Sequence, residues 1–561
     1  MRLMNLNVLR KIRDGLKSGK PLITALFRVD TDSQRHGGEL VAEVLKAHSV
    51  REIFTLCGGH ISPILVACIR VLDTRHEATA VFAADAAARL RQDIGVAAVT
   101  AGPGITNTVT ALKNAQMAES PVLLLGGASP SLLKGRGALQ DIDQQTLLRS
   151  LCKFTARVTS VPKSDTPGPV FVELPIDVLY PFKTVEREAG LSKEPKGVVK
   201  KMLDSFVRLH VASTFSDAWQ PQPLLPLPVH IPRPSSAQIE RMAELAMAPP
   251  VKASELAQTI EALCIPVYLG GMSRGLLGIN SAIQMRQERR EALREADLVI
   301  LAGAVCDFRL GYGRVLSPNC KVITINRSKE QMLKNHGVFW RSVLAVQADV
   351  ASTLVQLHQR DTSSDAWLGA LRLRDAEKEA RNASKAAGQT ADGRLNPLRL
   401  LNILNTLLPP NTILWLDPGA FGTLGVGAGF ALGAKAVHPD SPVLILYGDG
   451  ACGFSLMDFD SFVRHRLPVV ALIGNDACWA QIARDQVPWF NSSVGCELSY
   501  TSYDEVGRGL GARGVQFKEP TEDSEVRHQL GLALAKCLEG QSTVINALIG
   551  RTNFREGSIS V

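Results

Sequence analysis

Two polar clusters near the C-terminal end, each at the end of an apolar run, most constrain how this chain can fold. A Tyr-Gly-Asp-Gly sequence at 447–450 closes the apolar run 442–447, and an Asn-Asp pair at 475–476 closes the run 467–474. Such runs on either side of a helical segment at 456–464 predict two parallel strands joined by a crossover helix. Open α/β sheets bind ligands where their strands end, so both clusters are predicted to lie at a binding edge.

The residue types in these clusters indicate a cation site. Asp449, between Gly448 and Gly450, and the pair Asn475-Asp476 offer oxygen ligands of the kind that Mg²⁺ prefers. Mg²⁺ usually keeps few protein ligands and takes the others from phosphates. A Gly-Asp-Gly triplet alone is more often a surface turn, but the Asn-Asp pair 24 residues later makes the pattern specific. The sequence therefore predicts a metal–diphosphate site.

The composition is typical of a globular protein with several domains. A chain of 561 residues is long enough for three or four domains of about 150 residues each. The formal net charge of +8 is mild and no long basic tract contains aromatic residues, so nucleic-acid binding is not indicated. The ten cysteines show no C-x-x-C spacing, which argues against a zinc module or a disulfide scaffold.

The N-terminal segment is basic and amphipathic. Residues 1–20 contain six Lys or Arg residues and one acidic residue, with leucine and isoleucine recurring at helical spacing. Such a helix can lie on an anionic membrane surface or act as a transit peptide. A solvated helix that docks weakly on the first domain is an equally good interpretation. No apolar run reaches the 18 residues that a membrane-spanning helix needs.

Apolar strands that alternate with helical patterns predict an α/β fold with three doubly wound parallel-sheet domains. The predicted strands lie at 52–56, 95–100, 121–125 and 169–174 in the first domain and at 266–269, 298–302 and 322–325 in the second. The predicted order is a leader (1–35), a first domain (36–185), a proline-rich linker (186–235), a central domain (236–362), a helical linker (363–394) and a last domain (395–561).

A glutamate in the first domain is the candidate acid–base group. Glu77 follows an apolar strand at 69–72, so it is predicted to project at a sheet edge. A glutamate in this position can equally well be a first-turn helix residue that favours the helix dipole. A glycine-rich turn, Gly-Pro-Gly at 102–104 with Asn107 three residues later, follows the next strand, and glycine lets backbone approach a ligand closely.

These motifs together resemble those of thiamine-diphosphate (ThDP) enzymes. The matching segments are Asp-Thr-Arg-His-Glu at 73–77, Gly-Pro-Gly-x-x-Asn at 102–107, the small-residue stretch at 417–429 and the two C-terminal clusters. The resemblance implies that the three domains bind the pyrimidine ring, form a central domain and bind the diphosphate. It also implies a homodimer or homotetramer, because in this family the cofactor lies between two subunits.

The resemblance assigns roles to the C-terminal clusters and to Glu77. Asp449, Asp476 and the backbone carbonyl of Cys478 would hold Mg²⁺, with Asn475 beside them. Glu77 would activate ThDP by shifting its aminopyrimidine ring to the imino form. The other implied cofactor-binding residues are Gly102, Asn107, Leu424, Gly448, Gly450 and Ala451.

Three further residues match positions around the reacting part of the cofactor. Leu424 matches the bulky side chain that wedges beneath ThDP, although a close-packed helix start would explain it as well. Gln140 matches a glutamine that points into the active cavity. His60 is a candidate proton donor or acceptor, and a first-turn helix histidine is the competing interpretation.

Within the family, the motifs resemble 2-hydroxyacyl-CoA lyases in particular. This implies an acyl-CoA substrate that is cleaved, as in fatty acid α-oxidation, to formyl-CoA and an aldehyde one carbon shorter. Acetolactate synthesis or 2-oxoacid decarboxylation is the alternative reaction. The resemblance further implies a cytosol-facing site at the endoplasmic reticulum membrane, whereas the lack of a spanning run leaves a cytoplasmic location open. Nothing in the residues calls for FAD.

Several segments of the family pattern are missing. The losses fall near 66–71, 158–166, 248–251 and 413–417, and the last would remove the strand and glycine-rich loop that precede the small-residue stretch. Loss of a core strand exposes unpaired backbone and apolar side chains. A non-catalytic form that assembles with an intact enzyme is therefore the third interpretation.

Overall fold

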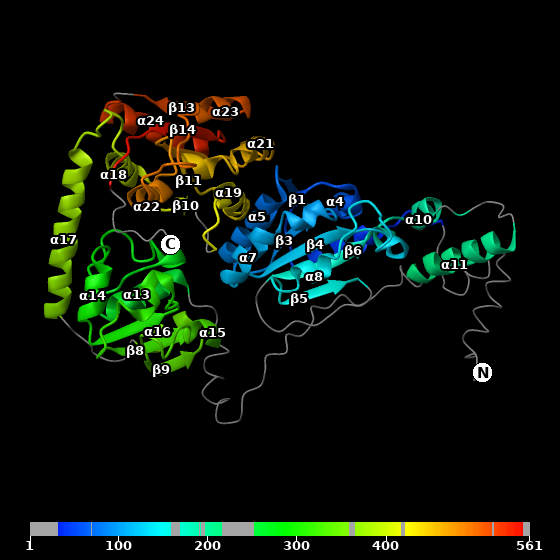
Figure 1. Cartoon of the computed structure of the whole chain (residues 1–561), viewed down its shortest axis with the longest axis horizontal. Helices are drawn as coiled ribbons and strands as arrows, with labels where there is room; N and C mark the ends of the chain where they lie inside the picture. Colours follow the sequence, from blue (N-terminus) through cyan, green and yellow to red (C-terminus); the bar gives the residue numbers. More distant parts are fainter. Residues whose placement is uncertain are drawn as a thin grey trace. The chain divides into compact units, whose positions relative to one another are not determined.

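The computed structural model describes residues 32–68, 70–158, 169–189, 191, 197–215, 252–357, 365–416, 421–518 and 521–553. The basic leader and the proline-dense segment at 221–234 lie outside these residues. The chain divides into two compact units (Figure 1). The first unit contains the sheets of the N-terminal and C-terminal domains, and the second contains the central domain.

The N-terminal domain is built on a six-stranded parallel sheet with the order β2-β1-β3-β4-β6-β5. Its strands are β1 (Ile53–Leu56), β2 (Val71–Asp73), β3 (Gly95–Val99), β4 (Val122–Ala128), β5 (Phe154–Arg157) and β6 (Val170–Pro175). Its longer helices are α3 (Gly37–Ala47), α4 (Ser62–Ala67), α5 (Glu77–Arg91), α7 (Val109–Met117), α8 (Gln144–Leu148), α10 (Phe182–Glu188) and α11 (Val198–Thr214). Every residue of β3 is buried, as expected for a central strand covered on both faces.

The C-terminal domain has a five-stranded parallel sheet with the order β10-β11-β12-β14-β13. Its strands are β10 (Ile413–Leu416), β11 (Val443–Gly448), β12 (Val470–Asn475), β13 (Arg513–Phe517) and β14 (Thr543–Leu548). Its helices include α18 (Pro397–Leu407), α19 (Val426–Val437), α20 (Asp449–Cys452), α21 (Phe459–Arg464), α22 (Ala480–Phe490), α23 (Tyr503–Gly509) and α24 (Asp523–Leu538). The segment at 413–416, next to one of the losses that the resemblance predicts, forms the edge strand of this sheet.

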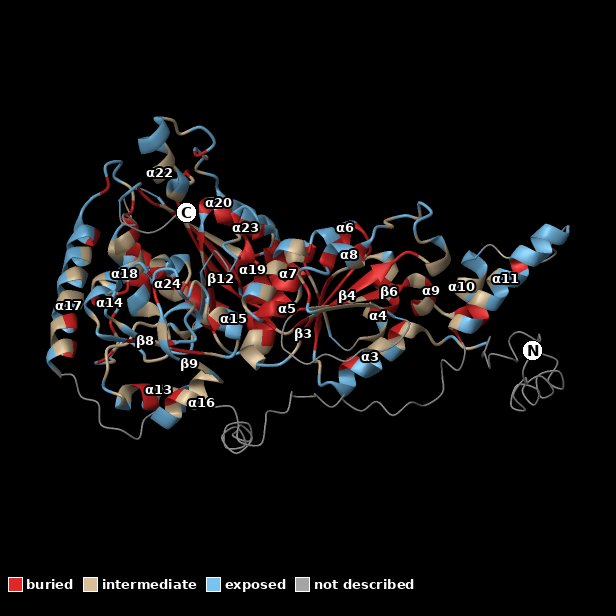
Figure 2. Ribbon diagram, turned by 60° about the horizontal axis from the view of Figure 1, so that its bottom comes forward, coloured by how far each residue is buried: buried red, intermediate tan, exposed pale blue. Residues whose placement is uncertain are grey.

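Two helices of small residues join the sheets of the first unit. A Cβ added at Gly429 of α19 would lie 2.5 Å from the Cβ of Phe82 on α5, and one at Gly433 would lie 2.2 Å from the carbonyl oxygen of Ala83. Larger residues would therefore push the helices apart. Figure 2 shows both helices largely in the colour of buried residues. The alanines that follow Glu77 thus serve close helix packing.

The central domain has a three-stranded parallel sheet, β7-β8-β9. The strands are β7 (Leu298–Ala302), β8 (Lys321–Asn326) and β9 (Ser342–Gln347), with helices α13 (Ala253–Ala262), α14 (Arg289–Glu295), α15 (Lys329–Met332), α16 (Val350–Leu357) and α17 (Asp365–Ala387). The strand predicted at 266–269 is wrong, because only an isolated bridge joins Val267 to Gln284. Pro266 lacks an N–H group for a ladder, and Gly270 and Gly271 end the segment at once.

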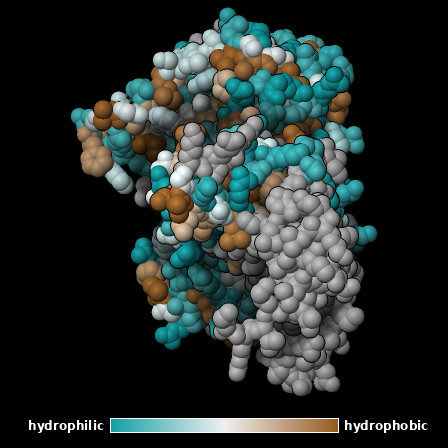
Figure 3. Space-filling view, turned by 90° about the vertical axis from the view of Figure 1, so that its right-hand side faces the viewer, coloured by the Kyte–Doolittle hydropathy of each residue, from teal (hydrophilic) through white to brown (hydrophobic). Residues whose placement is uncertain are grey.

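The linker predicted at 186–235 contains a helix that the proline content conceals. The end of α11 packs through Val211, Ala212 and Phe215. The Phe215 ring meets the Phe182 ring edge-on, with 5.4 Å between the ring centroids. Its first turns expose apolar side chains such as Phe206, and the face in Figure 3 shows hydrophobic side chains scattered among hydrophilic ones. Among the described residues, no helix combines the length and apolarity needed to cross a bilayer.

Candidate active site

The two C-terminal polar clusters lie side by side. Strands β11 and β12 pair in parallel with Gly448 opposite Gly474, so the turns that follow them leave the same edge of the sheet. Asp449 begins α20 and is 3% exposed. Its carboxylate accepts hydrogen bonds from the backbone N–H of Gly450 at 2.9 Å and of Cys478 at 3.3 Å. The loop after β12 therefore wraps onto the carboxylate that follows β11.

The carboxylates of Asp449 and Asp476 are both desolvated at this edge, and their negative charges repel each other. Burial raises the pKa of Asp449, although backbone N–H groups oppose the shift. Burial and the charge of Asp449 together raise the pKa of Asp476 to about 6. A divalent cation would offset both the cost of burying these charges and their mutual repulsion, because it pairs with the ionised carboxylates. The donor set therefore fits the predicted cation.

The protein supplies few ligands at this edge. No group of three or more His, Cys, Asp or Glu side chains suited to a metal occurs within the described ranges. The carbonyl of Ala477 already accepts hydrogen bonds from Leu498 N–H at 2.8 Å and from Arg551 at 3.0 Å. The carbonyl of Cys478 belongs to the same loop, and the resemblance implies it as the backbone ligand. Two carboxylates and one carbonyl match the sparse protein ligation of Mg²⁺.

Asn475 is turned away from this edge. It is fully buried, and its Nδ2 donates to the carbonyl of Thr501 and to Oδ1 of Asn546, both at 3.2 Å. Its Oδ1 accepts the backbone N–H of Ala477 at 3.2 Å. The Asn475 carboxamide therefore shapes the loop from within. A contribution of Asn475 to the metal site stays a prediction.

Arg551 supports the loop and was not found by sequence reasoning. Its Nε donates to the carbonyl of Asp476 at 3.2 Å, and its guanidinium also pairs with Glu497 at 2.6 Å. Arg551 lies 75 residues beyond the loop, so no local pattern connects them. It fixes the backbone that carries Asp476.

The glycines of the first cluster have different surroundings. A Cβ on Gly450 would lie 2.4 Å from the Trp479 ring, so only glycine fits beneath that side chain. No described atom lies within 4 Å of a Cβ built on Gly448, which leaves space above this backbone. Ala451 is buried, and Leu424 is partly buried against the main core.

The N-terminal sheet brings Glu77 and the glycine turn together. Glu77 is the first residue of α5 and is 7% exposed. Asn107 donates from Nδ2 to the Glu77 carboxylate at 2.9 Å, and a Cβ at Gly104 would lie 3.7 Å from the same carboxylate. The predicted glutamate, turn and asparagine therefore form one cluster.

His60 and Gln140 lie near the same sheet edge. The Nδ1 atom of His60 is 3.2 Å from the Thr100 hydroxyl, and burial lowers the pKa of His60, so the neutral imidazole prevails near pH 7. The backbone of Gln140 packs on Gly102, whose φ of +62° suits glycine. Sequence reasoning missed Gln144, which accepts the Gly102 N–H at 2.9 Å and holds the turn.

Asp458 is a buried acid that the sequence did not single out. It is 2% exposed, and its carboxylate accepts hydrogen bonds from Arg75 N–H at 2.8 Å and from the Thr79 hydroxyl at 2.9 Å. Burial raises the pKa of Asp458 to about 6. The folded protein therefore holds this proton more tightly than the unfolded chain does.

Asp458→Asn should flatten part of the pH dependence of stability. Because the folded pKa is raised, the stabilising effect of the proton is lost as pH rises through 6. Between pH 5 and pH 8 this lowers the free energy of unfolding by about 1.4 kcal/mol, roughly one pKa unit. Urea unfolding of both proteins at several pH values checks this. Parallel pH profiles for the two proteins would contradict it.

The fold and the polar clusters at the edges of the N-terminal and C-terminal sheets define a ThDP-dependent enzyme. The chain matches the N-terminal TPP binding domain of thiamine pyrophosphate enzymes at residues 35–147, their central domain at 250–357 and their C-terminal TPP binding domain at 401–547. The chain belongs to the thiamine pyrophosphate enzyme family, as the motifs predicted. Its three parallel-sheet domains confirm the predicted fold class.

Within that family, the chain is similar over nearly its whole length to proteins named 2-hydroxyacyl-CoA lyase 2. It is 53% identical to the Caenorhabditis elegans protein over 606 aligned positions, covering 98% of this chain and 94% of that protein. It is 50% identical to the human protein, covering 96% and 93%. An acetolactate synthase large subunit of Mycobacterium tuberculosis is 34% identical, covering 91% and 95%. The first alignment is longer than this chain, so the relative has residues that this chain lacks.

Proposed function

We propose that this chain is a ThDP- and Mg²⁺-dependent carbon–carbon lyase that cleaves long-chain 2-hydroxyacyl-CoA to formyl-CoA and an aldehyde one carbon shorter. The juxtaposition of Asp449 and Asp476 at one sheet edge carries this proposal. The near-complete similarity to 2-hydroxyacyl-CoA lyases supports the substrate class. The 34% identity to acetolactate synthases makes their reaction the less favoured alternative, and the similarity to lyases likewise disfavours a non-catalytic form.

The cofactor residues follow from the described geometry. Asp449, Asp476 and the carbonyl of Cys478 would hold Mg²⁺, and the space above Gly448 would admit the diphosphate. Leu424 would support the cofactor rings. When bound, ThDP supplies the carbanion stabilisation that cleavage beside a carbonyl needs.

Side chains of the N-terminal domain would carry out the proton transfers. Glu77, held by Asn107, would exchange a proton between its carboxylate and the aminopyrimidine ring. His60 faces Thr100 through Nδ1, which leaves Nε2 to take the proton of the substrate hydroxyl. Gln140 would orient the substrate. The absence of a side chain at Gly102 lets the backbone of Gln140 pack closely against it.

Product analysis tests the reaction. We expect purified protein with ThDP and Mg²⁺ to release formyl-CoA and the shortened aldehyde from a 2-hydroxyacyl-CoA, measured by mass spectrometry. Acetolactate from pyruvate, with no formyl-CoA from the hydroxyacyl-CoA, would instead establish the acetolactate reaction. A protein that binds ThDP but releases neither product would support the non-catalytic form.

We propose that the active form is a homodimer or homotetramer. Helix α22, all of which is described, has no buried residue, and Ile482, Trp489 and Phe490 are 50–71% exposed. A second copy would cover these side chains next to the metal loop. Analytical ultracentrifugation should give a dimer or larger species, and a fully active monomer would overturn this.

A cytosol-facing site at the endoplasmic reticulum membrane is proposed on the resemblance and on the basic leader at 1–20. Cytoplasm is the alternative. Cell fractionation with a tagged full-length chain distinguishes them, because a membrane-associated protein sediments with microsomes, and recovery only in the soluble fraction would favour the cytoplasm.

Arg551→Met should weaken Mg²⁺-dependent ThDP binding about tenfold, a typical loss when a residue that supports metal ligands is removed. The change removes the hydrogen bonds of Arg551 to the carbonyls of Asp476 and Ala477 and loosens the loop. Calorimetry measures the affinity, and Arg327→Met, which removes an exposed ion pair in the central domain, is the control. Equal affinities for the two variants would show that Arg551 does not support the loop.

A further inference from the structure

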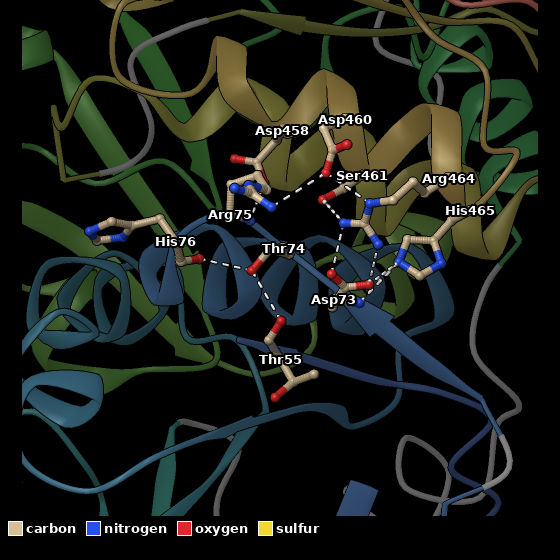
Figure 4. A network of polar contacts seen from close by, with 10 residues as sticks. All are labelled: Thr55, Asp73, Thr74, Arg75, His76, Asp458, Asp460, Ser461, Arg464 and His465. Carbon is tan, nitrogen blue, oxygen red and sulfur yellow. Dashed lines mark hydrogen bonds and ion pairs between the residues drawn. The ribbon is translucent and has the colours of Figure 1, made fainter. Parts of the chain in front are cut away.

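The segment that carries Glu77 is tied at two points to the C-terminal domain. Residues 73–79 run from the end of β2 into the first turn of α5, and residues 458–465 span α21 with one residue on either side. Figure 4 shows side chains of the two segments pointing toward one another across the domain boundary. These contacts lie inside the first compact unit.

The first tie is the Asp458 carboxylate. One of its oxygens accepts the backbone N–H of Arg75 at 2.8 Å, and the other accepts the Thr79 hydroxyl at 2.9 Å. These two donors lie two residues before and two residues after Glu77. Asp458 is 2% exposed and Thr79 is 3% exposed, so water does not compete for these bonds.

The second tie is an ion-pair cluster at Asp73. Arg464 donates to both oxygens of the Asp73 carboxylate, at 2.8 and 2.7 Å, and the Nε2 atom of His465 lies 2.7 Å from one of them. Asp460 holds Arg464 through its Nε at 2.8 Å. A bidentate arginine–carboxylate pair adds geometric specificity, so it fixes the end of β2 relative to α21.

The segment that carries Asp458 also follows directly from Asp449, the proposed metal ligand at the end of β11. Asp449 begins the short helix α20, and only the residues up to 457 separate it from Asp458. Within this stretch, the Ser455 hydroxyl bonds the Tyr447 hydroxyl at 2.9 Å, which fixes the segment to β11. One continuous segment thus connects the cation-binding carboxylate to the group that grips the Glu77 turn.

We propose that Asp458 is a positioning residue for Glu77: by bonding the backbone before it and the hydroxyl after it, Asp458 sets the direction in which Glu77 presents its carboxylate. The inference rests on the proposed function, in which Glu77 exchanges a proton with the cofactor. A loose first turn would let Glu77 move relative to its partner Asn107. Misplacement by about 1 Å can lower turnover about 100-fold.

The charged neighbours of Asp458 come from both domains. Arg75 and His76 of the N-terminal domain act on Asp458 electrostatically, and Asp460 of its own segment pairs with Arg75 at 3.6 Å. Protonation of Asp458 leaves one oxygen as an acceptor and turns the other into a donor. The grip on the Glu77 turn should therefore weaken as pH falls below the pKa of Asp458.

Two variants test this. Asp458→Ala removes both bonds, and Thr79→Val removes one without changing the shape of the side chain. We expect turnover number to fall about 100-fold and about fivefold, respectively, with KM and ThDP affinity within threefold of wild type. Asp440→Asn, which removes an exposed carboxylate of the same domain, should leave all three quantities unchanged.

Amide hydrogen exchange of the cofactor-free protein gives a second readout. The peptide covering residues 74–80 should exchange at least tenfold faster in Asp458→Ala and detectably faster in Thr79→Val. Normal turnover in Thr79→Val together with unchanged exchange would overturn the positioning role, even if Asp458→Ala failed to fold. Failure of the proposed function is a different result, since the wild-type protein would then release no formyl-CoA from a 2-hydroxyacyl-CoA.

Discussion

Glu77→Gln should lower the turnover number about 1000-fold while ThDP affinity stays within about threefold of the wild-type value. The substitution keeps the size of the side chain and an oxygen for the hydrogen bond from Asn107. It removes the ability to exchange a proton, and general acid–base groups contribute about 100- to 10,000-fold to rate. Steady-state kinetics with a 2-hydroxyacyl-CoA and calorimetry with ThDP measure the two quantities.

A matched control separates chemistry from folding. Glu39→Gln makes the same chemical change on α3, where the side chain is only partly buried and pairs with Arg35. It should leave turnover and affinity unchanged. Near-normal turnover of Glu77→Gln would remove Glu77 from the reaction, and equal losses of turnover and cofactor affinity would assign it to binding alone.

Asp449→Ala should weaken Mg²⁺-dependent ThDP binding at least 100-fold. It removes one of the two carboxylates proposed to bind the cation and also leaves the N–H groups of Gly450 and Cys478 without their acceptor. Both effects act against the same loop. Calorimetric titration of ThDP at several Mg²⁺ concentrations gives the affinity and its metal dependence.

Asp449→Asn distinguishes the two effects. Asparagine keeps an oxygen for the backbone N–H groups but removes the charge that binds a cation. We expect it to bind ThDP nearly as poorly as Asp449→Ala if the cation is the main link. Wild-type affinity in Asp449→Asn would show that this residue serves the loop and not the metal.

Several fully buried strands were predictable because their sequences are continuous apolar runs. The runs at 95–100, 442–447 and 467–474 became β3, β11 and β12 within a few residues. Strands β5 and β9 were missed because they lie at sheet edges and are half-buried or exposed, so they lack such runs. Helix α11 was missed because the prolines that follow it dominated the interpretation of its segment.

The candidate site was predictable only where strand order brings residues together. Asp449 and Asp476 end neighbouring strands, and Glu77 and Asn107 follow strands on either side of β1 in the first sheet. The contacts of Arg551, Gln144 and Asp458 join residues that are 42 to 383 positions apart. No local pattern encodes such contacts, and the inward turn of Asn475 depends on Asn546 in the same way.

Calorimetry of ThDP binding to the wild-type chain, with Mg²⁺ and again with EDTA, tests the cation site most directly. We expect saturable binding with Mg²⁺, loss of the signal in EDTA and recovery when Mg²⁺ is returned in excess. Binding of equal affinity in EDTA would contradict a cation held between Asp449 and Asp476, and so would a lack of binding in Mg²⁺.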